Sequence, residues 1–589
     1  MATTTHRLRP RPPASDPPHA STTLPASDTG LLREATRHSA ARCAALLLCA
    51  AGGAGAGLLL PFAIGRALDA VLAGHAAGRV GADATRWILV CAALIGARAV
   101  LDAVDGVLTA TTNARTTAWL RAHLTRHVLA VGPRTTARFA PGDLVARLVD
   151  NAAHAGVAPA TLAGLLAALV VPVGAVVALA LIDAWLAVAF IAGAPVLVLL
   201  LRAFTRATSD CVTRYQQVQG DIAGRLSEAV GGARTIAAAH TEDKEARRVL
   251  GPLPELSRHG HRMWRVQGRS QSQAAAVAPL LQIAVVAVAG HLVMGDRISV
   301  GELLAASRYA VLATGIGMLV GQLGALVRAK AAARRLGEVL AEPSATYGDA
   351  ELPPGGGLLE LRGVKVTRGE RTVLDGVDLT VPAGRTLAVV GRSGAGKSLL
   401  ASVAGRLADP DEGDVCLDGV PLRALGREEL RREVGYAFER PALLGTTLEG
   451  TIGFGAPRPT PSRIRAAARA AHAEPFITRL PDGYATPCAD APLSGGEAQR
   501  LGLARAFARG GRILILDDAM SSLDTVTEHH IAEALLHHTP HRSRLIIAHR
   551  AATAARADVV AWLDGGRIRA VGTHAELWER AEYREVFGA

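Results

Sequence analysis

The stretch Gly391-Arg392-Ser393-Gly394-Ala395-Gly396-Lys397-Ser398 decides how the second half of this chain folds. It reads G-x-x-x-x-G-K-S and lies between the apolar run 386–390, which predicts a buried parallel strand, and 399–407, which predicts a helix. The glycines let successive backbone N–H groups face a phosphate, and the start of the helix adds the positive end of its dipole. Lys397 is expected to reach the β- and γ-phosphates of a nucleotide, and Ser398 to ligate Mg²⁺. A glycine-rich turn carrying a lysine by chance is the alternative, but the flanking strand and helix favour a phosphate loop.

The composition indicates a chain that lies partly in a membrane. Half of its 589 residues are apolar, 20% are charged, and the mean hydropathy is +0.25. A net charge of +12 could indicate nucleic acid, but the placement of the arginines described below accounts for it, so no nucleic-acid partner is expected. The six cysteines show no metal-ligand spacing and are expected to be small buried hydrophobes without disulfides.

The first half of the chain predicts a transmembrane domain over 31–336. Residues 1–30 contain six prolines and predict a disordered tail, and 31–40 predict an amphipathic helix at the cytoplasmic surface. Six segments are apolar over about the 20 residues that a membrane-spanning helix needs. They lie near 42–66, 86–110, 157–182, 184–204, 273–294 and 303–327. The first contains Gly52, Gly53, Gly55 and Gly57, which permit close helix contacts.

Basic residues predict the orientation of these spans. Six arginines lie between spans two and three, and twelve Lys/Arg residues lie between Arg202 and Arg269, whereas the turns after spans three and five are short. Because basic loops stay in the cytoplasm, both long intervals and both termini are expected there. The expected location is therefore the cytoplasmic membrane, with multiple spans in the lipid bilayer.

Three charged residues inside span two have two interpretations. Arg98, Asp102 and Asp105 recur at helical spacing and so share one face of a helix. Arg98 and Asp102 are four residues apart and can neutralise each other. Ionisable groups in a membrane also commonly line a substrate pathway. Both interpretations remain open from the sequence.

The second half predicts an α/β domain over 358–589 that follows a linker at 337–357. Short apolar runs alternate with helical patterns, which is typical of a mainly parallel sheet with helices. The run 513–516 predicts a buried strand that ends in Asp517 and Asp518, and the first of these acids is expected in the Mg²⁺ shell. A further strand, 545–548, ends at His549.

A second anion site is predicted at Leu493-Ser494-Gly495-Gly496-Glu497, which opens a helix. Backbone N–H groups and the Ser494 hydroxyl at a helix start suit a phosphate. One phosphate loop already serves the nucleotide of this chain. The second site is therefore expected to close over a nucleotide that another subunit holds.

Together these motifs resemble the ATP-binding cassette (ABC) transporters, specifically an exporter-type half-transporter, over roughly residues 31–589. The stretch LSGGE is similar to the family signature, Ser521–Asp524 to its D-loop, and His549 to its switch histidine. The resemblance implies a membrane helical bundle followed by a P-loop cassette, and two cassettes that sandwich two ATP molecules head to tail. It implies that ATP contacts Arg368, Gly391, Arg392, Ser393, Gly394, Ala395, Gly396, Lys397, Ser398, Leu399 and Glu439. It implies catalytic roles for Asp518, His549 and Lys397, Mg²⁺ ligation by Ser398, Asp517 and Glu439, and contact of Ser494, Gly495, Gly496, Glu497 and the D-loop Asp524 with the partner's ATP.

Three residues depart from the family pattern at one nucleotide site. Asp518 stands where a catalytic Glu is usual, and misplacing such a group by about 1 Å can cost roughly a hundredfold in rate. Glu439 stands where the Q-loop glutamine is usual, and Arg368 where an aromatic residue usually stacks on adenine. The signature is intact. This asymmetry is similar to the subunit of a heterodimeric exporter that holds the slow, degenerate site, and a homodimer with two slow sites is the alternative.

The sequence thus predicts an ATP hydrolase that exports a small amphipathic molecule, such as a drug or secondary metabolite, with a second half-transporter as its partner. The alternatives are an exporter-shaped importer of a siderophore-like ligand, and an ATP-gated channel or regulatory ATPase. Generic Ala, Val and Leu at the lining positions leave the cargo unspecified.

Overall fold

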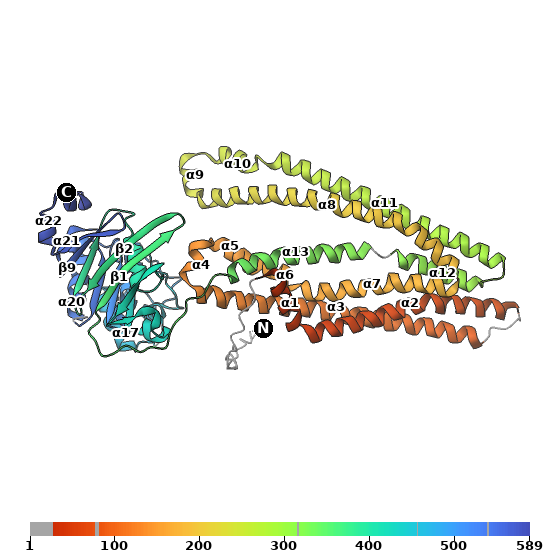
Figure 1. Ribbon diagram of the computed structural model, residues 1–589, viewed down its shortest axis with the longest axis horizontal. Coiled ribbons are helices and arrows are strands. Elements are labelled where there is room, and N and C mark those ends of the chain that lie inside the picture. Colours follow the sequence, from red (N-terminus) through yellow and green to blue (C-terminus); the bar gives the residue numbers. More distant parts are fainter. Residues whose placement is uncertain (1–26, 77–81, 315–316, 456–457, 539–540, 589) are drawn as a thin grey trace, which may run out of the picture. The chain divides into compact units, whose positions relative to one another are not determined.

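The computed structural model describes residues 27–76, 82–314, 317–455, 458–538 and 541–588. The chain folds into two compact units (Figure 1). The first comprises Met1–Leu129 and Phe139–Pro343, and the second comprises Ala130–Arg138 and Ser344–Ala589. The tail predicted at 1–30 lies outside the described residues up to position 26. Ser27 already caps the first helix, because its Oγ accepts a hydrogen bond from Gly30 N at 3.2 Å.

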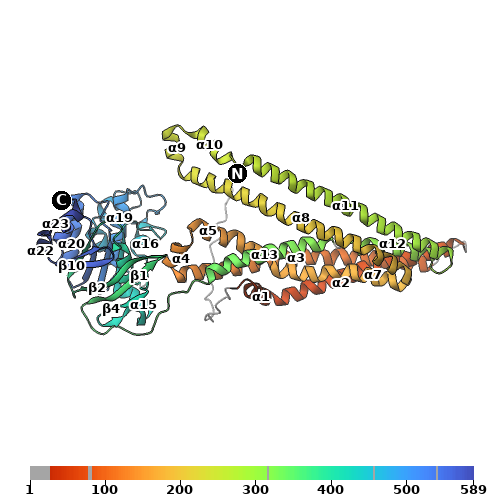
Figure 2. The same ribbon diagram turned by 45° about the horizontal axis from the view of Figure 1, so that its top comes forward.

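The first unit is built from helices. They are α1 (Asp28–His38), α2 (Ala40–Ala76), α3 (Ala82–Val131), α5 (Pro141–Ala146), a π-helical turn (Arg147–Asn151), α6 (Ala152–Gly156), α7 (Ala158–Ile182), α8 (Ala184–Gly231), α9 (Ala233–Ala239), α10 (Glu242–Leu250), α11 (Leu253–Met294), α12 (Val300–Ala313) and α13 (Gly317–Leu340). The short helix α4 (Pro133–Arg138) belongs to the second unit. The long helices α8 and α11 lie side by side, with α9 and α10 at one end of the pair (Figures 1 and 2).

Three stretches of the described residues are long and apolar enough to cross a membrane: Ala40–His75, Ala82–Val131 and Pro141–Ile182. They contain the first three predicted spans. Shorter apolar segments lie at Ala184–Gly193 and Pro279–Met294, inside the fourth and fifth predicted spans. The sixth predicted span falls on α12 and α13, which are separate helices, with 315–316 outside the described residues. A six-span topology therefore remains a prediction.

Glycine allows α2 and α12 to touch through their backbones. A Cβ at Gly65 would lie 2.5 Å from the carbonyl oxygen of Gly301, and one at Gly301 would lie 2.1 Å from that of Gly65. Asp69 caps the start of α12 across this contact, because its carboxylate accepts from Gly301 N at 2.8 Å and from Ser299 Oγ at 2.6 Å. Small residues at a helix contact maximise packing where burial from water contributes little.

Helix α1 packs on protein rather than only lying along a membrane surface. Leu31 and Ala35 are fully buried, and Leu31 packs in a cluster with Leu120 of α3 and with Leu336 of α13. Ser39, just after α1, shares a hydrogen bond of 2.9 Å with Thr116 Oγ1. The apolar face read from the sequence is thus covered by the helices of its own unit.

The second unit contains two sheets rather than one mainly parallel sheet. Strands β1 (Leu359–Arg368), β2 (Arg371–Val381), β4 (Glu412–Leu417) and β5 (Val420–Pro421) form an antiparallel sheet in the order β2-β1-β4-β5. Strands β3 (Thr386–Val390), β6 (Val434–Phe438), β7 (Ile513–Asp517), β8 (Ser543–Ile547), β9 (Val559–Asp564) and β10 (Arg567–Gly572) form the other, in the order β10-β9-β3-β8-β7-β6. All neighbours in this second sheet are parallel except β10, which is antiparallel to β9.

Helices and short turns connect and cover these strands. They are α14 (Lys397–Ala404), α15 (Arg427–Glu433), α16 (Leu448–Ile452), α17 (Pro461–Ala470), α18 (Glu474–Ile477), α19 (Gly495–Ala508), α20 (Thr525–His538), α21 (Ala551–Ala555), α22 (His574–Trp578) and α23 (Ala581–Arg584), with 3₁₀ turns at Leu422–Ala424, Gly483–Ala485 and Glu585–Phe587.

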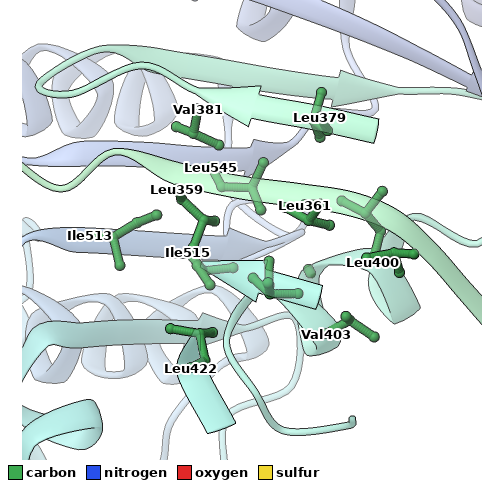
Figure 3. Packing of buried hydrophobic residues seen from close by; sticks show 14 of the residues in the cluster. Leu359, Leu361, Leu379, Val381, Leu400, Val403, Leu422, Ile513, Ile515 and Leu545 are labelled. Atoms are coloured by element: carbon green, nitrogen blue, oxygen red, sulfur yellow. The ribbon is translucent and has the colours of Figure 1, made fainter. Parts of the chain in front are cut away.

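One hydrophobic core joins the two sheets and the helix after the phosphate loop. Leu359 and Leu361 of β1 pack with Leu400 of α14, Ile515 of β7 and Leu545 of β8 (Figure 3). Each of these side chains is at most 2% exposed, and full burial of one contributes roughly 1.5–3 kcal/mol. The core therefore holds the ends of β3, β7 and β8, and with them the candidate site, in a fixed register.

Candidate functional site

The parallel strands bring the predicted site residues to one edge of the six-stranded sheet. Strands β6, β7, β8 and β3 are neighbours and point the same way. Glu439, Asp517, His549 and the loop 391–398 end or directly follow these strands. In open α/β sheets, ligands bind at the carboxyl ends of the strands. Segments more than a hundred residues apart in the chain thus form one site.

The phosphate loop has a conformation that requires glycine. Gly394 and Gly396 have φ of +80° and +101°, in the left-handed region. A Cβ at Gly391 would lie 2.1 Å from the carbonyl oxygen of Leu563, and one at Gly396 would lie 3.0 Å from Leu374 Cδ2. The second contact also places β2 directly beside the loop.

Lys397 is held inside this loop. Its side chain is 5% exposed, and Nζ donates to the carbonyl oxygens of Gly391 at 2.8 Å and Arg392 at 3.1 Å. Burial lowers the pKa of Lys397, and the charges of Asp518 and Asp517 oppose this shift. Both hydrogen bonds can be exchanged for bonds to phosphate oxygens when a nucleotide binds.

The other residues of the loop surround this lysine. Arg392, Ser393, Gly394 and Ser398 are exposed, whereas Ala395 and Leu399 pack partly against the core below. The Arg392 guanidinium forms an ion pair of 2.9 Å with Glu585 near the end of the chain.

Asp517 ends β7 with an unoccupied acceptor. Its Oδ1 is buried and has no hydrogen-bond partner among the described residues, while its Oδ2 accepts from the Tyr436 hydroxyl at 3.3 Å. Burial raises the pKa of Asp517, whereas hydrogen bonding to the hydroxyls of Ser398 and Tyr436 lowers it. A buried, unpaired carboxylate oxygen near a serine hydroxyl fits a hard divalent cation such as Mg²⁺.

Asp518 faces the histidine that follows β8. Its Oδ2 lies 3.8 Å from His549 Nε2, and its backbone has φ of +51°. Burial is the largest cause that raises the pKa of Asp518, His549 lowers it, and the charges of Glu439 and Asp517 raise it further. Two acids and one imidazole therefore share the end of two neighbouring strands.

Glu439 and Arg368 are more exposed. The Glu439 carboxylate lies 3.7 Å from the guanidinium of Arg440, and its charge raises the pKa of both Asp517 and Asp518. Arg368 ends β1 opposite Arg371, at the turn into β2, the strand that passes the phosphate loop.

The LSGGE stretch forms a closed capping box at the start of α19. Ser494 Oγ accepts from Glu497 N at 3.3 Å and donates to Glu497 Oε2 at 2.9 Å, and Ser494 N donates to the same oxygen at 2.9 Å. These bonds lower the pKa of Glu497. The sequence suggested a hydroxyl free for phosphate, whereas here Glu497 occupies it. Gly495 borders open space, since a Cβ placed there would meet no described residue beyond its own neighbours in the chain within 4 Å.

Comparison with known proteins places these motifs in a family. The model of the ABC transporter transmembrane region matches residues 43–316, and the ABC transporter model matches residues 374–521. The ABC transporter ATP-binding protein RamA of Streptomyces coelicolor is 50% identical over 545 residues, which cover 92% of this chain and 85% of that protein. The chain belongs to the ABC transporters.

Further relatives agree with an exporter-type half-transporter. The ATP-dependent lipid A-core flippase of Alkalilimnicola ehrlichii is 32% identical over 403 residues, covering 67% of this chain and 68% of that protein. A bacterial Atm1-family ABC exporter with ATP bound superimposes with a TM-score of 0.78 over 93% of this chain and 98% of its own, at 23% identity. This half-transporter therefore has the exporter fold, binds ATP, lies in a membrane and couples ATP hydrolysis to transport, and half-transporters of this kind act as dimers.

Gln499 is a site residue of this half-transporter that the sequence did not single out. It is 3% exposed, and its Nε2 donates to the carbonyl oxygen of Glu439 at 2.8 Å and to Ser521 Oγ at 3.0 Å. Its Oε1 accepts from Ser522 N at 2.9 Å. One side chain of the signature helix thus holds both the Glu439 loop and the D-loop. A glutamine one helical turn after a capping serine was a weak signal for this.

Arg550 links the switch histidine to the D-loop. Its guanidinium pairs with Glu528 and donates to the carbonyl oxygen of Leu523 at 3.3 Å, and Glu528 also accepts from Thr553 Oγ1 at 2.5 Å. Arg550, Glu528 and Thr553 line a cavity of about 100 Å³ that Asp518 and His549 also line. Asp524, at the end of the D-loop, accepts from Thr527 N at 3.0 Å and so caps α20.

Proposed function

We propose that this half-transporter exports a small amphipathic molecule across the cytoplasmic membrane as the degenerate-site subunit of a heterodimer. Asp518 carries the proposal. A catalytic carboxylate must reach a water in line with the γ-phosphate, and aspartate is one methylene shorter than glutamate. Because a displacement of about 1 Å can cost roughly a hundredfold, ATP held on this chain's own phosphate loop is hydrolysed slowly.

We assign a role to each residue at that site on the basis of its position. The loop Gly391–Ser398, which includes Lys397, holds the phosphates, and Leu399 anchors this loop. Arg368 stacks on adenine through its planar guanidinium. Ser398 and Asp517 would hold Mg²⁺, which supplies charge neutralisation at the transferring phosphate when bound. Glu439 adds a carboxylate beside these ligands. His549 orients the γ-phosphate, and Asp518 orients the attacking water.

The signature helix serves the second nucleotide of the dimer. When that nucleotide arrives, its γ-phosphate takes the Ser494 hydroxyl and the N–H groups of Gly495 and Gly496, and the Glu497 carboxylate turns away to make room. Asp524 of the D-loop lies toward the same partner. Because the signature LSGGE of this chain is intact, the ATP bound on the partner's phosphate loop is hydrolysed fast. The partner supplies a catalytic glutamate for that site.

Six spans with both termini in the cytoplasm complete the proposed arrangement, since both basic intervals then lie on the cytoplasmic side. Affinity purification of the tagged full chain from its own membranes tests the pairing. A second half-transporter is expected in stoichiometric amount, and the chain alone in lipid is expected to hydrolyse ATP very slowly. Ordinary turnover by the chain alone contradicts the proposal.

Inside-out vesicles energised with ATP test the direction. Accumulation of a fluorescent amphipathic probe indicates export, whereas its ATP-dependent depletion indicates import and contradicts the proposal.

A further inference from the structure

A cavity of about 360 Å³ lies within the helical unit, between α2, α3, α7 and α13. Its polar lining comes mainly from α3, with Arg98, Asp102, Asp105, Thr109 and Asn113. These positions are three or four residues apart, so they form one stripe along the helix. The stripe begins with charged groups and continues with neutral hydrogen-bonding groups.

Gly57 of α2 leaves room for Arg98 at the charged end of the stripe, and Asp102 packs beside Gly53. A Cβ at Gly57 would lie 2.9 Å from Arg98 Nη1, and one at Gly53 would lie 3.6 Å from Asp102 Oδ1. Arg98 Nε in turn lies 3.6 Å from Asp102 Oδ2. The predicted pairing of Arg98 with Asp102 is confirmed, and the pair lines a cavity, whereas the substrate pathway stays a prediction.

Asp105 remains after this pairing. It lines the same cavity and forms no ion pair with any described residue. The cavity thus holds two carboxyl groups and one guanidinium, so one carboxyl group has no cationic partner among the described residues. The opposite walls are small and apolar, including Leu46 and Ala50 of α2 and Ala167 of α7. An unpaired acid beside such walls in a membrane segment is costly unless a cation or water meets it.

Asn113 adds an unfilled acceptor at the other end of the stripe. Its Oδ1 is buried and has no hydrogen-bond partner in the described part of the chain. Eight residues separate it from Asp105, which is a rise of about 12 Å along the helix. A ligand that lies along α3 can therefore meet a carboxylate at one end and an amide acceptor at the other.

We propose that this cavity binds an amphipathic amine, with the basic group at Asp105 and the apolar body against the alanine- and leucine-lined walls. Hydrogen-bond donors of the ligand then lie toward Thr109 and Asn113. The inference rests on the proposed function, and it adds that the exported molecule carries a positive charge.

Binding of a matched pair of fluorescent probes tests this charge preference. The probes are dansylcadaverine, a primary amine, and its N-acetyl derivative, which has the same body without the charge. The full chain, with any subunit that co-purifies, is placed in nanodiscs without nucleotide, and empty nanodiscs are subtracted. The amine is expected to bind at least about tenfold more tightly than the acetylated probe.

Two matched variants locate the charge. Asp105→Asn is expected to remove the preference by weakening amine binding, and Asp83→Asn, at an exposed acid in the first turn of α3 outside the cavity, is expected to keep it. If the unmodified protein binds the two probes with equal affinity, the inference is overturned, and this outcome does not depend on how any variant behaves. Equal effects of the two substitutions overturn it as well.

This test is separate from that of the proposed function, because binding here requires no ATP. If the protein binds the amine more tightly than the acetylated probe but vesicles do not accumulate the probe with ATP, the proposal of export is contradicted and the inference about the cavity is not. Accumulation of both probes at equal rates removes the inference and leaves export standing.

Discussion

The Nε2 atom of His549 lies 3.8 Å from the Oδ2 atom of Asp518, across the carboxyl ends of two adjacent parallel strands. These residues are 31 positions apart in the sequence, and the parallel pairing of β7 with β8 brings them together in space. The relationship matters because the imidazole and the carboxylate would address the same γ-phosphate and its attacking water. Under the proposed function, the length of the acidic side chain sets the rate of hydrolysis at this site.

Extending this side chain is expected to accelerate hydrolysis. Asp518→Glu moves the carboxylate outward by one methylene, and a gain of up to about a hundredfold follows if reach is what limits the site. Turnover of MgATP is measured in an assembly whose partner carries an inactive nucleotide site. Asp490→Glu, the same extension at an exposed acid of the second unit, serves as the control. An unchanged rate in Asp518→Glu would show that reach is not limiting.

Removing the charge of Asp517 is expected to abolish the thermal stabilisation of the chain by Mg²⁺, whereas the stabilisation by ATP should remain. Asp517→Asn keeps the shape of the side chain and weakens a hard-cation ligand. The measurement is the thermal midpoint of the full chain with ATP, with and without Mg²⁺. In the unmodified protein, the rise in thermal midpoint that Mg²⁺ causes should also become smaller as the pH is lowered. Burial raises the pKa of Asp517, so protons begin to compete with the metal at a higher pH than they would at an ordinary aspartate. A full Mg²⁺ increment in Asp517→Asn contradicts the assignment.

Replacing Gln499 with Leu is expected to destabilise the second unit by about 2–4 kcal/mol. The substitution removes the hydrogen bonds from the buried Gln499 side chain to the carbonyl oxygen of Glu439, the Ser521 hydroxyl and the Ser522 N–H, and each such bond contributes about 0.5–1.5 kcal/mol, not fully additively. Denaturant unfolding measures the loss. An unfolding free energy for Gln499→Leu equal to that of the unmodified protein would argue against the hydrogen-bond explanation.

The capping box at α19 is expected to depend on pH. Hydrogen bonds from Ser494 lower the pKa of Glu497 below its ordinary 4.5. A depressed acid stabilises the fold above its unfolded pKa, and this contribution is lost as pH falls through the folded value. Glu497→Gln should therefore increase hydrogen exchange at 495–501 near neutral pH. The difference should vanish well below pH 4.5, after correction for intrinsic exchange.

A control for this comparison is Glu582→Gln at an exposed position of α23, which is expected to leave exchange at 495–501 unchanged at every pH. A difference between the unmodified chain and Glu497→Gln that persists undiminished at pH 3 is inconsistent with a titrating cap.

Local pattern was enough to predict the phosphate loop, the acidic end of β7, the start of α19 and the helical character of the first unit. Each depends on neighbours in the chain: glycine spacing, a short apolar run before acids, and a serine three residues before a glutamate. The length of an apolar segment likewise reports on a membrane helix without any knowledge of its contacts. The separate antiparallel sheet of β1, β2, β4 and β5 was not predicted, because β1, β2 and β4 alternate apolar and exposed residues in short runs that do not show which strands will pair.

Which side chains meet was decided by the tertiary structure. Parallel pairing brings Asp518 to His549, and Gln499 joins two loops that lie 60 and 22 residues away from it. Burial leaves Asp517 Oδ1 without a hydrogen-bond partner in the part of the chain that the structure describes. In the helical unit, Gly57 on α2 leaves room for Arg98, and Asp105 lines the cavity beside it without an ion pair to any described residue. Sequence determines the conformation a segment prefers, because that depends on its own residues. Packing determines the partner of each charge, because a partner is supplied by a distant segment that only folding brings near.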